Sequence, residues 1–117
     1  MYQEDGMNVA RKVFVTQYVS KLNYEVLNGY GEIVFLLDQE YLPEPAPTDM
    51  NDKLSDSMAR KLLSSYVVGV DFIVMTGSAI PNMVTGVILS EMKSQTRHKI
   101  LKWSNEHKSY QHFNIKL

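Results

Sequence analysis

The chain contains no cysteine, which excludes disulfide bonds and thiolate chemistry and makes a cytoplasmic location the expectation. It also lacks a long apolar run, because the longest, IVFLL at residues 33–37, is far shorter than a membrane span. The first residues, MYQEDGMNVARK, contain acids and no apolar segment, so we expect no secretory signal. These absences argue against a membrane protein and against a disulfide-stabilised secreted domain.

A large net charge is absent as well. The chain has 12 basic and 13 acidic side chains and a formal net charge of −1. This near balance argues against a protein that coats nucleic acid nonspecifically. The charges are unevenly placed, since residues 92–117 hold six bases and one acid. We interpret this positive end as solvated strand and turn surface.

The 117 residues, 44% of them hydrophobic, are enough for one domain with a buried core. We expect residues 1–11 to form a flexible N-terminal tail and residues 12–117 to form a single domain. Only four prolines are present, and three of them alternate with other residues in the segment 43–47. Because proline neither continues a helix nor pairs into a sheet, residues 38–49 are expected to be a surface loop.

Five segments combine β-branched, aromatic or alternating apolar residues and therefore predict strands. They are residues 12–17, 32–37, 71–75, 98–103 and 110–117. Between the first two strands there is room for a short helical turn at residues 24–27 only. The strands are short and several are apolar throughout, which is typical of strands covered on both faces.

Two segments repeat apolar residues at helical spacing. The first helix is expected to begin at Thr48 or Asp49 and to end at Tyr66, with Leu63 beside its main apolar face. The second is expected to begin after Ser78 as N-cap. Its expected buried residues are Met83, Val84, Val87, Ile88 and Met92, and its first turn tolerates Pro81. Gly86, in its middle, is expected to allow a close approach to the sheet.

The order β-β-α-β-α-β-β, in which helices separate successive strands, predicts an α/β fold. We expect a single three-layer, Rossmann-like domain with a mainly parallel sheet of about five strands. The last strand is expected to form an antiparallel C-terminal hairpin and to lie at the edge. An exposed edge strand of this kind would allow a dimer through edge pairing.

The carboxyl ends of parallel strands meet at one edge of a sheet, where ligands usually bind. Thr16 and Gln17 end the first strand, and Thr76-Gly77-Ser78 end the third and begin a helix at once. Such a junction leaves backbone N–H groups unpaired beside the positive end of the helix dipole. The turn is therefore suited to hold an anion such as phosphate.

The candidate ligand-binding residues at this edge are Thr16, Gln17, Glu40, Tyr41, Thr76, Gly77, Ser78, Asn82, Lys102 and Trp103. Gly77 would let the backbone approach a phosphate closely, and Asn82 would add an amide one turn into the helix. Lys102 would neutralise charge. Trp103 or Tyr41 would stack on a base.

These features also have structural interpretations. Gly77-Ser78 equally suits a tight turn followed by a helix cap, because T-G-S is neither a P-loop nor a GxGxxG sequence. Strand alternation puts Trp103 and Lys102 on different faces and brings the ring near Phe113 in the hairpin. That register favours a core position for Trp103.

Catalytic and metal-binding patterns are scarce. The acids at residues 38, 40, 44 and 49 are irregularly spaced in the proline-containing loop and are expected to be solvated. The three histidines have no partners at metal-ligand spacing, and Ser78 is not in a G-x-S-x-G sequence. We therefore expect no metal and no cofactor, and a binding protein rather than an enzyme.

Three stretches, GEIVFLLDQEYLPEP, DFIVMTGSAI and HKILKWSNEHKSYQHF, combine a strand, a T-G-S turn, a helix and a closing lysine-tryptophan hairpin. With this pattern, from Lys12 onward, the chain resembles a family of small uncharacterised α/β proteins of bacteriophage genomes. The resemblance implies a phage or mobile-element context and carries over no catalytic residue. Small phage proteins are often accessory factors that bind a small molecule or a host protein.

The leading hypothesis is a small accessory protein that binds a nucleotide-like or other phosphorylated ligand at the T-G-S turn. The competing hypothesis is a protein-interaction factor or inhibitor that binds a host protein. The proline-containing loop, the hairpin edge or the positive end would then make the contact. A third hypothesis, a phosphoester hydrolase, would need a base or metal cluster that the sequence does not supply.

Overall fold

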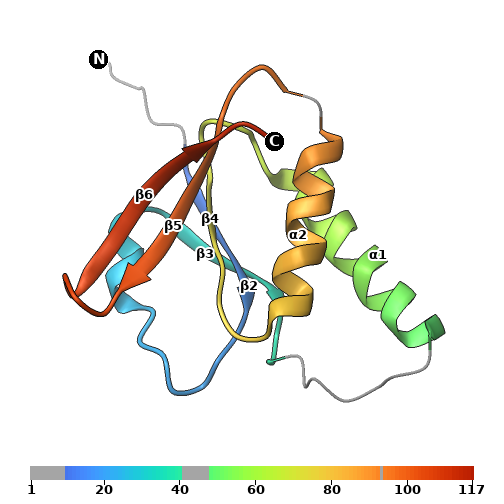
Figure 1. Ribbon diagram of the computed structural model, residues 1–117, viewed down its shortest axis with the longest axis horizontal. Helices are drawn as coiled ribbons and strands as arrows, with labels where there is room; N and C mark the ends of the chain where they lie inside the picture. Colours follow the sequence, from blue (N-terminus) through green and yellow to red (C-terminus); the bar gives the residue numbers. More distant parts are fainter. Residues whose placement is uncertain (1–9, 41–47, 93) are drawn as a thin grey trace.

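The computed structural model describes residues 10–40, 48–92 and 94–117. The elements are β2 (Lys12–Gln17), the 3-10 helix η1 (Glu25–Gly29), β3 (Glu32–Leu37), α1 (Thr48–Ser65), β4 (Phe72–Val74), α2 (Ala79–Glu91), β5 (His98–Ser104) and β6 (Ser109–Ile115). Their order agrees with the order predicted from the sequence (Figure 1). Residues 1–9 of the predicted tail and residues 41–47 of the predicted loop, Tyr41 included, lie outside the described residues.

The strands form one five-stranded sheet in the order β3-β2-β4-β5-β6. β2 pairs in parallel with β3 and with β4, and β4 pairs in parallel with β5. Among the described strands only β6 is antiparallel, and it forms a hairpin with β5. The predicted α/β domain, with a mainly parallel sheet and an antiparallel C-terminal hairpin, is therefore confirmed.

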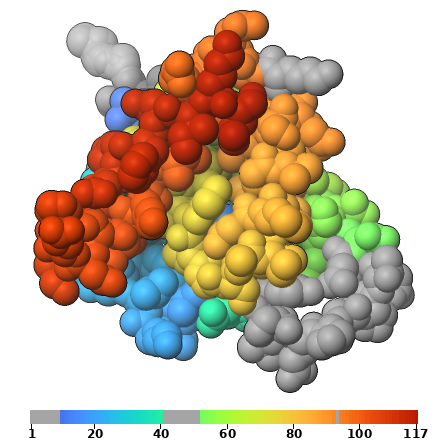
Figure 2. All heavy atoms as spheres, viewed as in Figure 1, coloured from blue at the N-terminus to red at the C-terminus, as the bar shows by residue number. Residues whose placement is uncertain are grey.

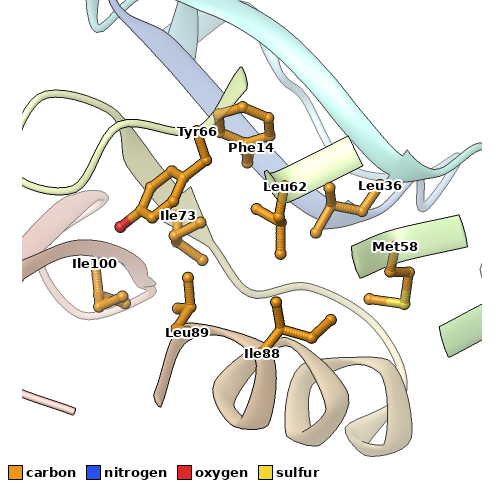
Figure 3. Close-up of a cluster of buried hydrophobic side chains, with 9 residues drawn as sticks. All are labelled: Phe14, Leu36, Met58, Leu62, Tyr66, Ile73, Ile88, Leu89 and Ile100. Atoms are coloured by element: carbon orange, nitrogen blue, oxygen red, sulfur yellow. The ribbon is translucent and has the colours of Figure 1, made fainter. Parts of the chain in front are cut away.

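Both α-helices cover the same face of the sheet (Figure 1). On this face, strand residues such as Phe14 and Ile100 pack against the helices in one cluster. In Figure 3, Ile88 of α2 lies toward Met58 of α1, whereas Leu89 lies toward Ile100 of β5. Burying an aliphatic side chain fully is worth about 1.5–3 kcal/mol, so α2 is held through both neighbours.

The opposite face of the sheet has a thinner cover. Here Val15, Phe72 and Leu101 pack around Leu27 of η1, which is fully buried. Tyrosines from the loops on either side of η1, Tyr24 among them, pack against this cluster. The third layer is therefore a single 3-10 turn with aromatic side chains, because only residues 18–31 connect β2 to β3.

The predicted burial of two α2 residues is wrong, and an apolar residue of α1 is exposed as well. Met83 and Val87 of α2 are 61% and 54% exposed, and Leu63 of α1 is 67% exposed. Helical spacing put them on or beside apolar faces, but the two helices lie side by side on one sheet face, and no described residue covers their outer surface. The expected close approach at Gly86 is also wrong, since a Cβ there would meet no atom within 4 Å.

Neither α-helix, as far as the described residues extend, is both long enough and apolar enough to cross a bilayer.

Candidate functional site

The topology creates a switch point at the carboxyl ends of β2 and β4. These two strands are parallel neighbours. β2 leads to β3 through η1 on one face of the sheet, whereas β4 leads to β5 through α2 on the other face. Neighbouring strands whose connections leave on opposite faces open a crevice, and open α/β sheets usually hold ligands there. The predicted segments around Gln17 and Gly77 both lie at this point (Figure 1).

A hydrogen-bond network joins the end of β2 to the turn after β4. The Thr16 hydroxyl donates to Asn82 Oδ1 over 2.6 Å and accepts from the Thr76 N–H over 3.0 Å. The Thr76 hydroxyl donates to the Gln17 carbonyl over 2.6 Å, and Asn82 Nδ2 donates to the Ser78 carbonyl over 3.1 Å. The structure thus brings these five predicted residues together, and they bond to one another.

The Gln17 side chain fills the inside of the turn. It is fully buried, and its Nε2 donates to the carbonyl of Thr76 and, over 2.9 Å, to that of Ser78. Its Oε1 accepts a hydrogen bond from the Ser78 N–H over 3.2 Å. The Gln17 amide oxygen therefore lies where an anion held by this N–H would lie.

Gly77 and Pro81 fit the same arrangement. Gly77 has a φ of 67°, in the left-handed region that favours glycine, and a Cβ there would lie 3.0 Å from the Gln17 amide. Ser78 is the N-cap residue of α2, as predicted, although its side chain forms no capping hydrogen bond. Pro81, in the first turn, has no N–H to offer an anion. Gly77 makes room for Gln17 in this conformation.

A pocket of about 350 Å³ lies beside the turn, on the η1 side of the sheet. The loop after β2, the end of β4 and the hairpin supply its lining: Lys21, Leu22, Asn23, Val26, Val74, Met75, Thr76, Trp103 and Tyr110. Most of these side chains are apolar or aromatic, with a few polar groups among them, which is the usual composition of a small-molecule site. Figure 2 shows the segment after β4 (yellow) at the surface between the hairpin (red) and α2 (orange).

Tyr24 fixes the loop that forms one wall of this pocket. Its hydroxyl accepts a hydrogen bond from the Val19 N–H over 2.7 Å. Its ring stacks on Tyr18 and meets Phe35 edge to face, with centroid distances of 5.6 and 5.1 Å. Burial is the main cause that raises the pKa of the Tyr24 hydroxyl, and the neighbouring Tyr18 and Glu40 raise it further.

Trp103 and Tyr110 belong to the hairpin wall. They pair across the hairpin, and their rings meet edge to face at 5.2 Å. The Trp103 indole N–H donates to Asn105 Oδ1 over 3.0 Å, which orients the ring. Burial raises the pKa of the Tyr110 hydroxyl, so this side chain presents a neutral phenol.

The core position that the sequence favoured for Trp103 is wrong. Trp103 is 40% exposed, and its cross-strand partner is Tyr110, whereas Phe113 pairs with Ile100. Trp103 stays exposed because the third layer is thin. The 3-10 helix η1 packs on the centre of the sheet and leaves the tip of the hairpin uncovered.

The remaining predicted residues lie apart from the pocket. Lys102 is exposed on the helix side of the sheet, because it alternates with Leu101 and Trp103 along β5. Glu40 is exposed beyond the end of the edge strand β3, and Tyr41 lies outside the described residues. Across the described ranges, no three His, Asp or Glu side chains are grouped so that they could hold a metal ion.

Sequence analysis missed the loop wall of the pocket, above all Lys21, Leu22 and Val26. The signal that could have found them is their position directly after the first strand, at the same carboxyl edge as the T-G-S turn. It missed Tyr110 because Trp103 was expected to lie near Phe113 in the hairpin, whereas Trp103 pairs with Tyr110. A four-residue turn at 105–108 pairs Ser104 with Ser109 and sets the register observed.

Comparison with known proteins agrees with the resemblance carried by the strand, turn and hairpin segments. Neither a curated protein nor a solved structure matches the chain. A protein family described as "Phage Pam3 gp32-like protein" matches residues 8–117, which include every helix and strand among the described residues. The chain therefore belongs to the Phage Pam3 gp32-like protein family.

Proposed function

We propose that this phage-family protein binds a nucleotide-like small molecule in the pocket between the loop after β2 and the hairpin. The observation that carries the proposal is the position of Trp103, a half-exposed aromatic ring that lines a pocket at the switch point of the sheet. Stacking of a base on such a ring is worth about 1–3 kcal/mol.

The other lining groups support a ligand with a planar ring and an anionic group. Val26, Met75 and Tyr110 would offer apolar surface to a ring, and the ammonium of Lys21, which also lines the pocket, would neutralise a phosphate. Because Gln17 fills the T-G-S turn, we assign the phosphate to Lys21 and not to the N-terminus of α2. We therefore keep a nucleotide-like ligand, as in the leading hypothesis, but place it in the pocket beside the T-G-S turn.

Titration with nucleoside monophosphates tests this proposal. Trp103 is the only tryptophan of the chain, so its fluorescence reports on the pocket directly, and calorimetry gives the affinity. We expect nucleoside monophosphates to bind, nucleosides to bind about 3- to 10-fold more weakly, and ribose 5-phosphate to bind weakest. No heat and no fluorescence change with any of the four common bases would contradict the proposal.

Three variants locate the site. Val26→Glu puts a charge into the apolar wall and is expected to abolish binding, whereas Lys21→Gln is expected to reduce it about 3- to 10-fold for ligands that carry a phosphate. Lys102→Gln is the matched control, since Lys102 lies one residue from Trp103 but on the other face of the sheet. Equal loss of affinity in Lys102→Gln and Lys21→Gln would show that charge, and not this pocket, determines binding.

A protein-interaction role is the second candidate function. It is favoured by the apolar side chains on the outer surface of α1 and α2, where Leu63, Met83 and Val87 are more than half exposed. Exposed apolar side chains that gather on one surface often mark a binding site for another macromolecule, and we propose that these three do. If Met83→Asp abolishes a stoichiometric complex that co-purifies with wild type, while Val26→Glu leaves it intact, the helix surface is the interaction site.

A further inference from the structure

The outer edge of β6 is open in the part of the chain that the structure describes. β6 ends the sheet order and pairs with β5 alone. An edge of this kind presents a row of backbone N–H and C=O groups to any chain that can pair with it. β6 is seven residues long, which gives it enough groups to hold a second strand.

The composition of β6 does nothing to block such pairing. The strand SYQHFNI contains no lysine, arginine, aspartate, glutamate, proline or glycine. Natural edge strands are usually protected by charges, prolines, bulges or a covering element. Phe113 and Ile115 are 42% and 39% exposed on the helix side of the sheet, because α2 does not extend over the hairpin. Pairing would remove apolar surface from water as well as satisfy the backbone.

The other edge of the sheet is different. Glu32 begins β3, and the Lys61 ammonium of α1 donates to the carbonyls of Phe35 and Leu36, each over 3.2 Å. A strand added to β3 would have to displace this contact. The two edges are therefore unequal, and a head-to-tail contact of β6 on β3, which would grow into a filament, is disfavoured.

We propose that β6 pairs antiparallel with β6 of a second copy of this chain, forming a two-fold symmetric dimer. An antiparallel pair of identical strands is self-complementary, so the contact closes after two copies. The result is a continuous sheet of ten strands, five from each copy. The uncharged strand lets identical surfaces meet without repulsion, which a lysine-rich edge would prevent.

The flanking lysines select the register. A register centred on His112 would bring Lys108, in the hairpin turn, close to Lys116 of the second copy, and this like-charge contact is unfavourable. A register centred on Phe113 sets Lys116 opposite Tyr110 and places the two Phe113 rings together on the helix side. Aromatic pairs directly opposite each other stabilise antiparallel strands. The dimer is therefore assigned the Phe113-centred register.

Analytical ultracentrifugation of the full chain tests the dimer. Wild type is expected to sediment with about twice the 13.4 kDa chain mass at micromolar concentrations. Phe113→Lys puts two ammonium groups opposite each other and is expected to raise the dimer dissociation constant at least about 100-fold. Lys53→Glu, an exposed change on α1, is the control and is expected to leave the dimer intact. Circular dichroism checks that each variant is folded.

A charge-swap experiment tests the register. Phe113→Glu is also expected to be monomeric by itself, and mixing it with Phe113→Lys is expected to restore a heterodimer, because the two residues then face each other. A wild type that is monomeric at every concentration would overturn the proposal. So would a dimer that survives Phe113→Lys, because its interface would then lie elsewhere. A mixture that stays monomeric would reject the Phe113-centred register.

Discussion

Gln17 connects the fold to the candidate site. As the last residue of β2 it was predicted to lie at the carboxyl edge, and it does, because strand alternation and strand length are readable in KVFVTQ. The hydrogen bonds of its amide to the turn after β4 could not be predicted. They depend on β2 and β4 being neighbours and on Gly77 leaving space, and neither is a local property of the sequence.

The first prediction at this scale concerns Gly77. Gly77→Ala places a Cβ 3.0 Å from the Gln17 amide at a positive φ of 67°. We expect a loss of unfolding free energy of about 1–3 kcal/mol, measured by urea denaturation. Gly29→Ala is the control, because a Cβ at Gly29 meets nothing within 4 Å. Equal effects of the two substitutions would contradict the tight contact between Gly77 and Gln17.

A second prediction concerns the buried Tyr66–His98 pair at the other end of the sheet. The Tyr66 hydroxyl and His98 Nδ1 are 2.6 Å apart, and both side chains are buried. Burial lowers the pKa of His98, against a smaller opposing effect of the Leu89 backbone. Below a pH of about 6.5 the unfolded state binds the proton more readily than the folded state. Stability is therefore present above this pH and is lost as the pH falls.

Urea denaturation at about pH 7.5 and about pH 5.5 measures this loss. We expect His98→Gln to be less stable than wild type at the higher pH and to lose less stability on acidification. His107→Gln is the control, because it removes an exposed histidine by the same substitution. A wild-type slope in His98→Gln would show that other groups cause the acid sensitivity.

For the helices and strands, local sequence patterns predicted where each element begins and ends to within a few residues. The reason is that alternation, β-branched residues and proline positions act over short distances. The exposed sides of the helices were predicted poorly. Met83 and Val87 have helical spacing suited to burial, yet the helices share one sheet face and have nothing described above them. Periodicity gives the direction of an apolar face but not how much of it is covered.

Gly86 gives the prediction that belongs to α2. A Cβ at this position would meet no atom within 4 Å, and glycine in a helix interior costs about 0.5–1 kcal/mol relative to alanine. Gly86→Ala is therefore expected to raise the free energy of unfolding by about 0.5–1 kcal/mol, which urea denaturation measures as a higher midpoint. Leu89→Ala, three residues on and fully buried, is expected to cost about 2–5 kcal/mol. A destabilised Gly86→Ala would mean that α2 packs more closely than the structure shows.

At the scale of the whole molecule, the sequence predicted the direction of the strands but not their order. Helical connections between strands require parallel pairing, and this is visible in the sequence. Several apolar strands of similar length are interchangeable in composition, so the central position of β2 between β3 and β4 was not predictable. That position creates the switch point, and the pocket depends on it, with walls from the loop after β2, from β4 and from the hairpin.

Chemical-shift mapping tests the pocket most directly. Isotope-labelled protein is titrated with nucleoside monophosphates, and the shifts of backbone amides and of the Trp103 indole N–H are followed. We expect the largest changes at Leu22, Val26, Met75 and Tyr110 and at the indole, which line the pocket. Changes confined to Ser78 and Asn82 would place the ligand at the turn that Gln17 fills. No changes with any nucleotide would contradict nucleotide-like ligand binding altogether.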